Sequence, residues 1–139
     1  MKPPILIVNL KIYKRAIGIN ALKFCEYALE LKRQYGTDVY IAVNPLDLRL
    51  CLDKFREIVF SQNSDAAGYG AKTGHISIDA LGEIGVKGTI INHSEFKIKH
   101  EVIKEIVNRA RELNICTVVC ADSIEELKSM LNLGIKPTA

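Results

Sequence analysis

The chain has 139 residues, of which 48% are apolar and 25% charged, and its formal net charge is +3. This composition excludes a disordered chain, because disorder goes with low apolar content and large net charge. The longest apolar run has about five residues, against the ~20 needed to cross a bilayer, and the charges form no basic stripe for nucleic acid. We therefore expect a cytoplasmic protein that binds neither membrane nor nucleic acid.

Short apolar runs without alternation predict strands that are covered on both faces, as in a parallel sheet. They are Ile5–Val8, Val39–Val43, Ile58–Phe60, Thr89–Ile91 and Thr117–Cys120. Segments of helical period between them predict helices over residues 21–35, 46–55, 78–84, 101–113 and 124–133. This alternation predicts a parallel α/β fold, with residues 1–139 in a single domain and no linker.

The four cysteines, Cys25, Cys51, Cys116 and Cys120, each lie inside an apolar stretch. That placement predicts reduced, mostly buried thiols and not a disulfide framework. Cys116 and Cys120 would be about 13 Å apart along a strand, too far to bridge. No CxxC pair occurs and the histidines lie elsewhere, so we expect no metal site.

Polar residues gather at the carboxyl end of every predicted strand. They are Asn9 and Lys11, Asn44, Gln62 and Asn63, Asn92-His93-Ser94-Glu95, and Asp122. In parallel α/β folds this edge of the sheet holds the ligand. Loop starts and helix caps account for some of these residues, but not for a lysine or a histidine directly after a buried strand. The pattern therefore favours a binding site at this edge.

Two of these residues could carry chemistry. Lys11 would place an ammonium group over the edge of the sheet, where it could hold an anionic substrate; a solvated lysine at a loop start is the alternative. His93 could polarise a carbonyl as a hydrogen-bond donor, with a helix N-terminus aimed at its ring; a capping or surface histidine is the alternative. Glu95 could pair with Lys11, or be a surface carboxylate in the first turn of a helix.

The connection from Gln62 to Ser77 is long for a link between a strand and a helix. Gly68-Tyr69-Gly70 suggests a phosphate loop, but the position that would need the third glycine is Thr73. A long ordered loop is often a binding or subunit-contact element.

Three segments together resemble triosephosphate isomerase of the short archaeal type: Val8-Asn9-Leu10-Lys11, Tyr69-Gly70-Ala71-Lys72-Thr73-Gly74-His75, and Asn92-His93-Ser94-Glu95. The resemblance covers essentially the whole chain, in order and with the expected spacing. It implies interconversion of dihydroxyacetone phosphate and glyceraldehyde 3-phosphate through an enediolate, in glycolysis and gluconeogenesis, without a cofactor.

The resemblance also implies roles for single residues. Asn9 and Lys11 would bind the substrate, with Lys11 facing its negative charge. His93 would be the neutral electrophile that polarises the carbonyl, a role for which this family is a standard example. Glu95 would have a supporting role. Thr73 would be the loop tip that enters a neighbouring subunit, which implies a homo-oligomer formed through residues 62–77.

The chain departs from the family in two places. Phe96-Lys97 replaces a common basic pair, and Pro137-Thr138-Ala139 falls where a sixth strand would begin. A complete (β/α)₈ barrel needs about 250 residues, so we expect an incomplete TIM barrel with about five of eight βα units. The family's catalytic glutamate, closing lid and phosphate loops belong to the later units.

Two explanations of this shortness stay open. A second polypeptide could supply strands six to eight, or the chain could be the N-terminal part of a longer enzyme. An alternative of another class is a self-contained flavodoxin-like domain with a binding or regulatory role. That alternative usually needs acidic residues where this chain has Asn9, Lys11 and Gln62.

Overall fold

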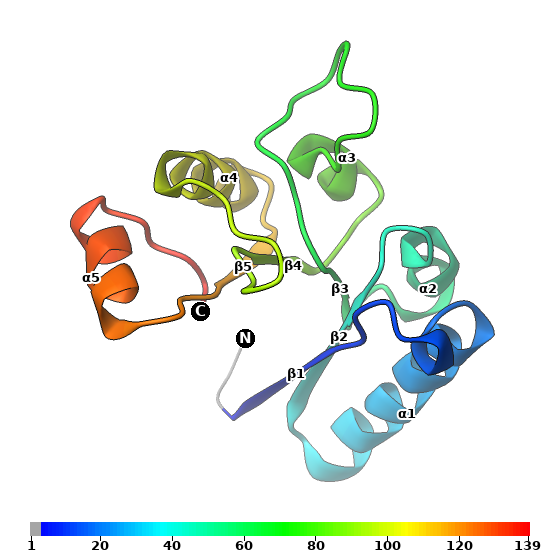
Figure 1. The fold of residues 1–139 in the computed structure, drawn as a ribbon. Helices are drawn as coiled ribbons and strands as arrows, with labels where there is room; N and C mark the ends of the chain where they lie inside the picture. The colour runs from blue at the N-terminus through cyan, green and yellow to red at the C-terminus, as the bar shows by residue number, and fades with distance from the viewer. Residues whose placement is uncertain (1–3) are drawn as a thin grey trace. The chain divides into compact units, whose positions relative to one another are not determined.

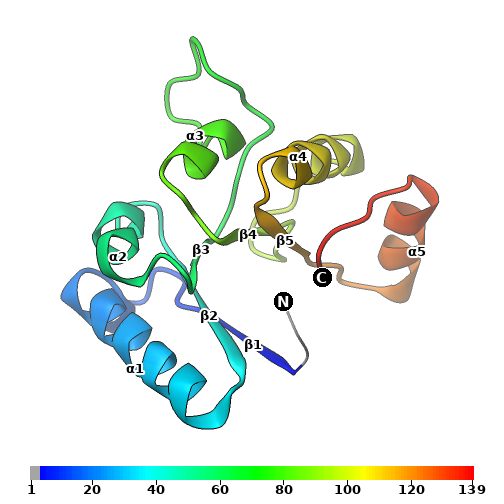
Figure 2. The same ribbon diagram turned by 180° about the vertical axis from the view of Figure 1, so that it is seen from behind.

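A computed structural model describes residues 4–139, in which strands and helices alternate along the chain (Figures 1 and 2). The strands are β1 (Ile5–Asn9), β2 (Asp38–Val43), β3 (Val59–Ser61), β4 (Gly88–Ile91) and β5 (Cys116–Val119). The helices are α1 (Ile19–Tyr35), α2 (Leu48–Phe55), α3 (Ile78–Glu83), α4 (His100–Glu112) and α5 (Ile124–Asn132), with a short 3₁₀ helix η1 (Lys14–Ala16). Every predicted strand and helix is confirmed to within one or two residues; η1 was not predicted.

The described chain packs as two compact units. One contains residues up to 62 together with 84–87, and the other contains residues 63–83 and 88–139. The expectation of a single domain over residues 1–139 stays a prediction.

The first unit is built on three parallel strands. β1 pairs with β2 from Ile5 opposite Asp38, and β2 pairs with β3 from Ile41 opposite Val59. β3 is buried throughout and β2 is buried after its first residue, as the unbroken apolar runs predicted. β1 differs, because its Leu6 side chain is 48% exposed. This strand is therefore covered on one face only.

Helix α1 covers this sheet with small side chains. Ala21, Cys25 and Ala28 are buried, and their size lets the helix approach the strands closely. The helix ends at Gly36, which has a left-handed φ of 65° and donates its N–H to the Lys32 carbonyl at 3.0 Å.

The second unit carries β4 and β5 in parallel, with Gly88 opposite Cys116. Helix α4 packs its apolar side into this unit, burying four side chains: Ile103, Ile106, Val107 and Ala110. Residues 138–139 run beside β5, where Thr138 donates to the Thr117 carbonyl and Ala139 accepts from the amide of Val119.

The four cysteines are free thiols with different environments. Cys25 and Cys51 are buried in the first unit, whereas Cys116 and Cys120 are half-buried in the second. The expectation of buried thiols is therefore confirmed for Cys25 and Cys51, and only in part for Cys116 and Cys120. A hydrogen bond with Cys51, together with burial, raises the pKa of Cys25. No helix within residues 4–139 is long and apolar enough to cross a membrane.

Candidate active site

Asn9 and Lys11 form a strained turn at the end of β1 in the first unit. Lys11 has a positive φ of 52°, which is uncommon for a residue with a side chain. The Asn9 side-chain oxygen accepts from the Lys11 amide at 3.0 Å, and Gln62 donates to the Lys11 carbonyl at 3.0 Å. Backbone strain of this kind persists only where the surroundings hold it, and it gathers at functional sites. The Lys11 ammonium lies 6.0 Å from the centre of the Tyr13 ring.

Asn44 has a structural role in the same unit. Its amide nitrogen donates to Asp47, and its oxygen accepts from the Leu46 amide at 2.9 Å. The same Asp47 carboxylate accepts from the Gly18 amide at 3.0 Å, so this pair joins the loops before α1 and α2. Both polar atoms of the Asn44 side chain therefore bind other parts of the protein, which is a structural role.

His93 lies just beyond β4 in the second unit, and its side chain is 26% exposed. Its Nδ1 atom accepts a hydrogen bond from the Glu95 amide at 3.2 Å. The nearest oxygen of the Glu95 carboxylate is further away, at 3.6 Å from Nδ1. A ring nitrogen that accepts carries no proton, so the backbone bond favours a neutral ring with its proton on Nε2. This is the tautomer that can donate to a carbonyl oxygen.

The segment after His93 is not helical. Residues 94–96 form a turn and bend, and α4 begins only at His100. The expectation that Glu95 occupies the first turn of a helix is therefore wrong. So is the expectation of a helix N-terminus directly behind the His93 ring. The reason is that Asn92 uses its side chain to hold this segment as a loop, accepting from the Ile98 amide at 3.1 Å.

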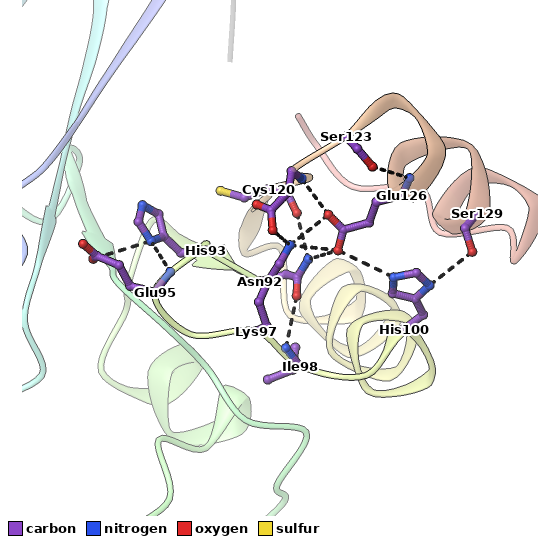
Figure 3. Close-up of polar contacts among 11 residues, drawn as sticks. Asn92, His93, Glu95, Lys97, Ile98, His100, Cys120, Ser123, Glu126 and Ser129 are labelled. Carbon is purple, nitrogen blue, oxygen red and sulfur yellow. Dashed lines mark hydrogen bonds and ion pairs between the residues drawn. The ribbon is translucent and has the colours of Figure 1, made fainter.

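Glu126, near the start of α5, is the centre of a polar cluster that the sequence did not reveal (Figure 3). We call Asn92, Lys97, Asp122 and Glu126 the Glu126 cluster. Lys97 donates to both carboxylate oxygens of Glu126 at 2.8 Å, and the Asp122 amide donates at 2.6 Å. The hydrogen bond from Lys97, followed by that from the Asp122 backbone, lowers the pKa of Glu126 to about 2. The carboxylate is therefore charged at any neutral pH.

Lys97 is the cationic member of this cluster. Burial works to lower the pKa of Lys97, but its bonds to Glu126 and Asp122 outweigh burial and raise that pKa. The Lys97 ammonium lies 2.9 Å from the Asp122 carboxylate. Phe96-Lys97 thus retains one cation of the basic pair that the resemblance led us to expect, and that cation is fully engaged.

Thr73 is exposed and lies in a turn of the loop that precedes α3. The loop itself extends beyond that helix (Figure 1). The base of the loop is closed by Asp65, whose carboxylate accepts from the Ile76 amide at 2.7 Å and lies 3.2 Å from His75. The long connection between β3 and α3 is confirmed as a loop. Contact with another subunit stays a prediction.

The structure thus brings Asn9 and Lys11 together in one unit, and His93 and Glu95 together in the other. Gln62, which the sequence marked only as a polar strand end, holds the Lys11 backbone. Among residues 4–139, no group of three or more His, Cys, Asp or Glu side chains is arranged to bind a metal.

Comparison with known proteins decides the family. The family model described as triosephosphate isomerase matches residues 4–132. The chain belongs to the triosephosphate isomerase family. It is 35% identical to the triosephosphate isomerase of Caldivirga maquilingensis over all of its own length and 61% of that protein. It is 37% identical to that of Sulfurisphaera tokodaii, again over its whole length and 60% of the relative.

The fold agrees with this assignment. The chain is similar to the crystal structure of triosephosphate isomerase from Bartonella henselae, with a TM-score of 0.76 and 20% identity over 98% of this chain and 63% of that one. The expected incomplete TIM barrel is confirmed. The flavodoxin-like alternative is wrong, because that fold places its first strand between the second and third, whereas here β2 pairs with β3. This member of the triosephosphate isomerase family spans about 60% of the length of the curated relatives it matches.

Proposed function

We propose that this chain supplies the Asn9, Lys11 and His93 part of a triosephosphate isomerase active site. The reaction would interconvert dihydroxyacetone phosphate and glyceraldehyde 3-phosphate without a cofactor, in glycolysis and gluconeogenesis in the cytoplasm. The observation that carries the proposal is the 3.2 Å bond from the Glu95 amide to Nδ1 of His93, which leaves the Nε2 proton for the substrate carbonyl.

The chemistry asked of His93 is electrostatic. When a proton leaves the carbon next to the carbonyl, negative charge grows on the carbonyl oxygen and an enediolate forms. A neutral imidazole that already donates to this oxygen stabilises the charge without first having to reorient. The proton returns to the neighbouring carbon, so the reaction needs no oxidant, reductant or added group.

Lys11 would supply the positive charge that binds an anionic triose phosphate. Its backbone is held from both sides, by the Asn9 side chain and by Gln62, in a conformation that a lysine seldom adopts. A charge that is already held in place can stabilise the transition state without a further loss of conformational entropy. Asn9 would bind substrate beside it, and Glu95 would support His93.

The proposal assigns no base to this chain. The proton-transferring carboxylate, the lid and the phosphate loops would come from a segment that corresponds to the remaining ~40% of the relatives' length. That segment would belong either to the same polypeptide or to a second one. The proposed assembly is a homo-oligomer in contact through residues 62–77, with Thr73 near the neighbouring subunit.

A coupled isomerase assay tests the proposal on the chain alone and mixed with a separately expressed strand-six-to-eight segment of the Sulfurisphaera tokodaii relative. We expect activity only in the mixture, and a loss of at least about a hundredfold in His93→Gln or Lys11→Ala. Lys23→Ala, an exposed lysine on α1, is the matched control and should leave the rate unchanged. A folded chain that shows no activity in the mixture, or mutants as active as the parent, would contradict the proposal.

A further inference from the structure

We infer that the Glu126 cluster positions His93, and that Asn92 and Glu126 select the ring tautomer with its proton on Nε2. This inference rests on the proposed function for its catalytic meaning, but the structural claim can be tested without any turnover. Asn92 and Glu126 are positioning residues, since their side chains bind other protein groups and would act on the reaction through His93.

Asn92 joins the end of β4 to two other segments. Its side chain is buried, with the residue only 1% exposed, and its backbone has a left-handed φ of 59°. The amide nitrogen donates to the Cys120 carbonyl at 2.9 Å and to Glu126 at 3.0 Å, while the oxygen accepts from Ile98. A glycine would permit the same φ but could form none of these bonds. The side chain is therefore needed for more than the turn.

The loop that contains His93 is held at both ends by one carboxylate. Asn92, directly before His93, and Lys97, four residues after it, both donate to Glu126 (Figure 3). Glu126 is 18% exposed, and its bonds to these two residues come from a single helix, α5. The ends of the segment 92–97 are consequently fixed relative to each other.

Between these ends, two groups compete for Nδ1 of His93. The Glu95 amide lies 3.2 Å away and can only donate, so it requires Nδ1 without a proton. The Glu95 carboxylate oxygen lies 3.6 Å away and can only accept, so it requires a proton on Nδ1. A shift of less than an ångström in the turn would exchange the two and remove the proton from Nε2. Fixing both ends of the loop prevents that shift.

A second histidine, His100, lies against the Glu126 cluster and provides an internal reference. Nε2 of His100 lies 3.7 Å from Glu126, and its Nδ1 lies 3.3 Å from the hydroxyl of Ser129. Removing the Glu126 charge therefore acts on His100 directly. It would act on His93 only through the loop.

The test is nitrogen-15 NMR of the imidazole rings in the purified chain at pH 8, where long-range proton–nitrogen correlations separate the two tautomers. We expect His93 in the parent chain to hold its proton on Nε2 by an excess of about tenfold or more. In Asn92→Gly and in Glu126→Gln this excess should fall at least severalfold. Lys97→Arg keeps the cation and should retain the parent tautomer.

Ser123→Ala is the matched control for a purely structural effect. It removes the cap of α5, where the Ser123 hydroxyl accepts from the Glu126 amide at 3.0 Å, and leaves the side chains of the Glu126 cluster in place. It should lower stability without changing the His93 tautomer. The inference is overturned if the parent chain shows no dominant Nε2 tautomer, if both cluster variants match the parent, or if Ser123→Ala shifts the tautomer as much as they do.

The same variants in the reconstituted isomerase mixture separate this inference from the proposed function. Asn92→Gly should lower kcat by about tenfold or more with a smaller effect on KM, because only the donor to the transition state is displaced. A tautomer shift in a mixture without isomerase activity would leave the positioning role standing and reject the proposed function. An active mixture in which the variants show no tautomer shift would support the proposed function and reject the positioning role.

Discussion

Gln62, at the end of β3, donates to the main-chain carbonyl of Lys11 at 3.0 Å, across 51 residues of sequence. The same amide group donates to the Ala42 carbonyl at 3.1 Å, so one side chain joins three strand ends of the first unit. The left-handed backbone of Lys11 is held from the end of β3, two strands away in the sheet, as well as by its own turn. A rigid strand thus fixes the lysine that would bind the substrate.

Gln62→Leu should therefore weaken both stability and substrate binding. The loss of two donated hydrogen bonds should lower the free energy of unfolding by about 1–2 kcal/mol, measured by urea denaturation. In the reconstituted mixture, KM should rise severalfold because the Lys11 ammonium is no longer preorganised. Gln34→Leu, an exposed position on α1, is the control and should change neither quantity. Parent-like KM and stability in Gln62→Leu would show that Asn9 alone holds the turn.

The Glu126 carboxylate should make the stability of the chain depend on acid pH. The pKa of Glu126 falls from 4.5 to about 2 in the folded chain, so the unfolded chain binds its proton first. The stabilisation is therefore complete above about pH 4.5 and is lost as the pH falls towards 2. Glu126→Gln should be less stable than the parent by roughly 1–3 kcal/mol at pH 7, and the difference should vanish near pH 2. Glu125→Gln, its exposed neighbour, should stay within about 0.5 kcal/mol at both pH values.

The order and bounds of the helices and strands could be predicted because the signals are local. Unbroken apolar runs mark buried strands, and Gly36 and Gly85 follow helices with the left-handed φ values that are common for glycine at that position. The exposed face of Leu6 on β1 could not be predicted this way. Burial of a strand depends on which elements cover it, and that information is not in the run itself.

The candidate site could be predicted only in part. Lys11 and His93 stand out because loop starts and helix caps do not account for a lysine or a histidine directly after a predicted buried strand, and Asn9 stands out with Lys11 through the resemblance to the family. The contacts that hold them join residues far apart in the chain, as Asn92 and Glu126 are, and no spacing rule links such pairs. The left-handed backbone at Asn92 did carry a signal, because asparagine is enriched in that conformation. The three hydrogen bonds of the Asn92 side chain had no such signal in the sequence.

Arg109 should be essential to the packing of α3 on α4. Asp79 is buried on α3, and Arg109 on α4 donates to its carboxylate from two guanidinium nitrogens. Arg109→Ala would leave this buried carboxylate without its partner, so it should lower the free energy of unfolding by more than the loss of an exposed ion pair does. Glu112→Ala removes the exposed partner of the same arginine and should cost at most about 0.5 kcal/mol. Thermal and urea unfolding of the two variants would separate these values, and equal losses would contradict the buried role of Asp79.

Thr73 provides the test of the proposed subunit contact. It lies exposed in a turn of a loop whose base is closed by Asp65, so a large charged side chain there should not disturb the fold of the chain itself. If the tip enters a neighbouring subunit, Thr73→Arg would bury an unpaired charge in the contact and lower the mass measured by sedimentation. Asn132→Arg, on the exposed end of α5, adds the same charge elsewhere and should leave the mass unchanged. An unaltered mass in Thr73→Arg would mean that copies of this chain do not associate through residues 62–77.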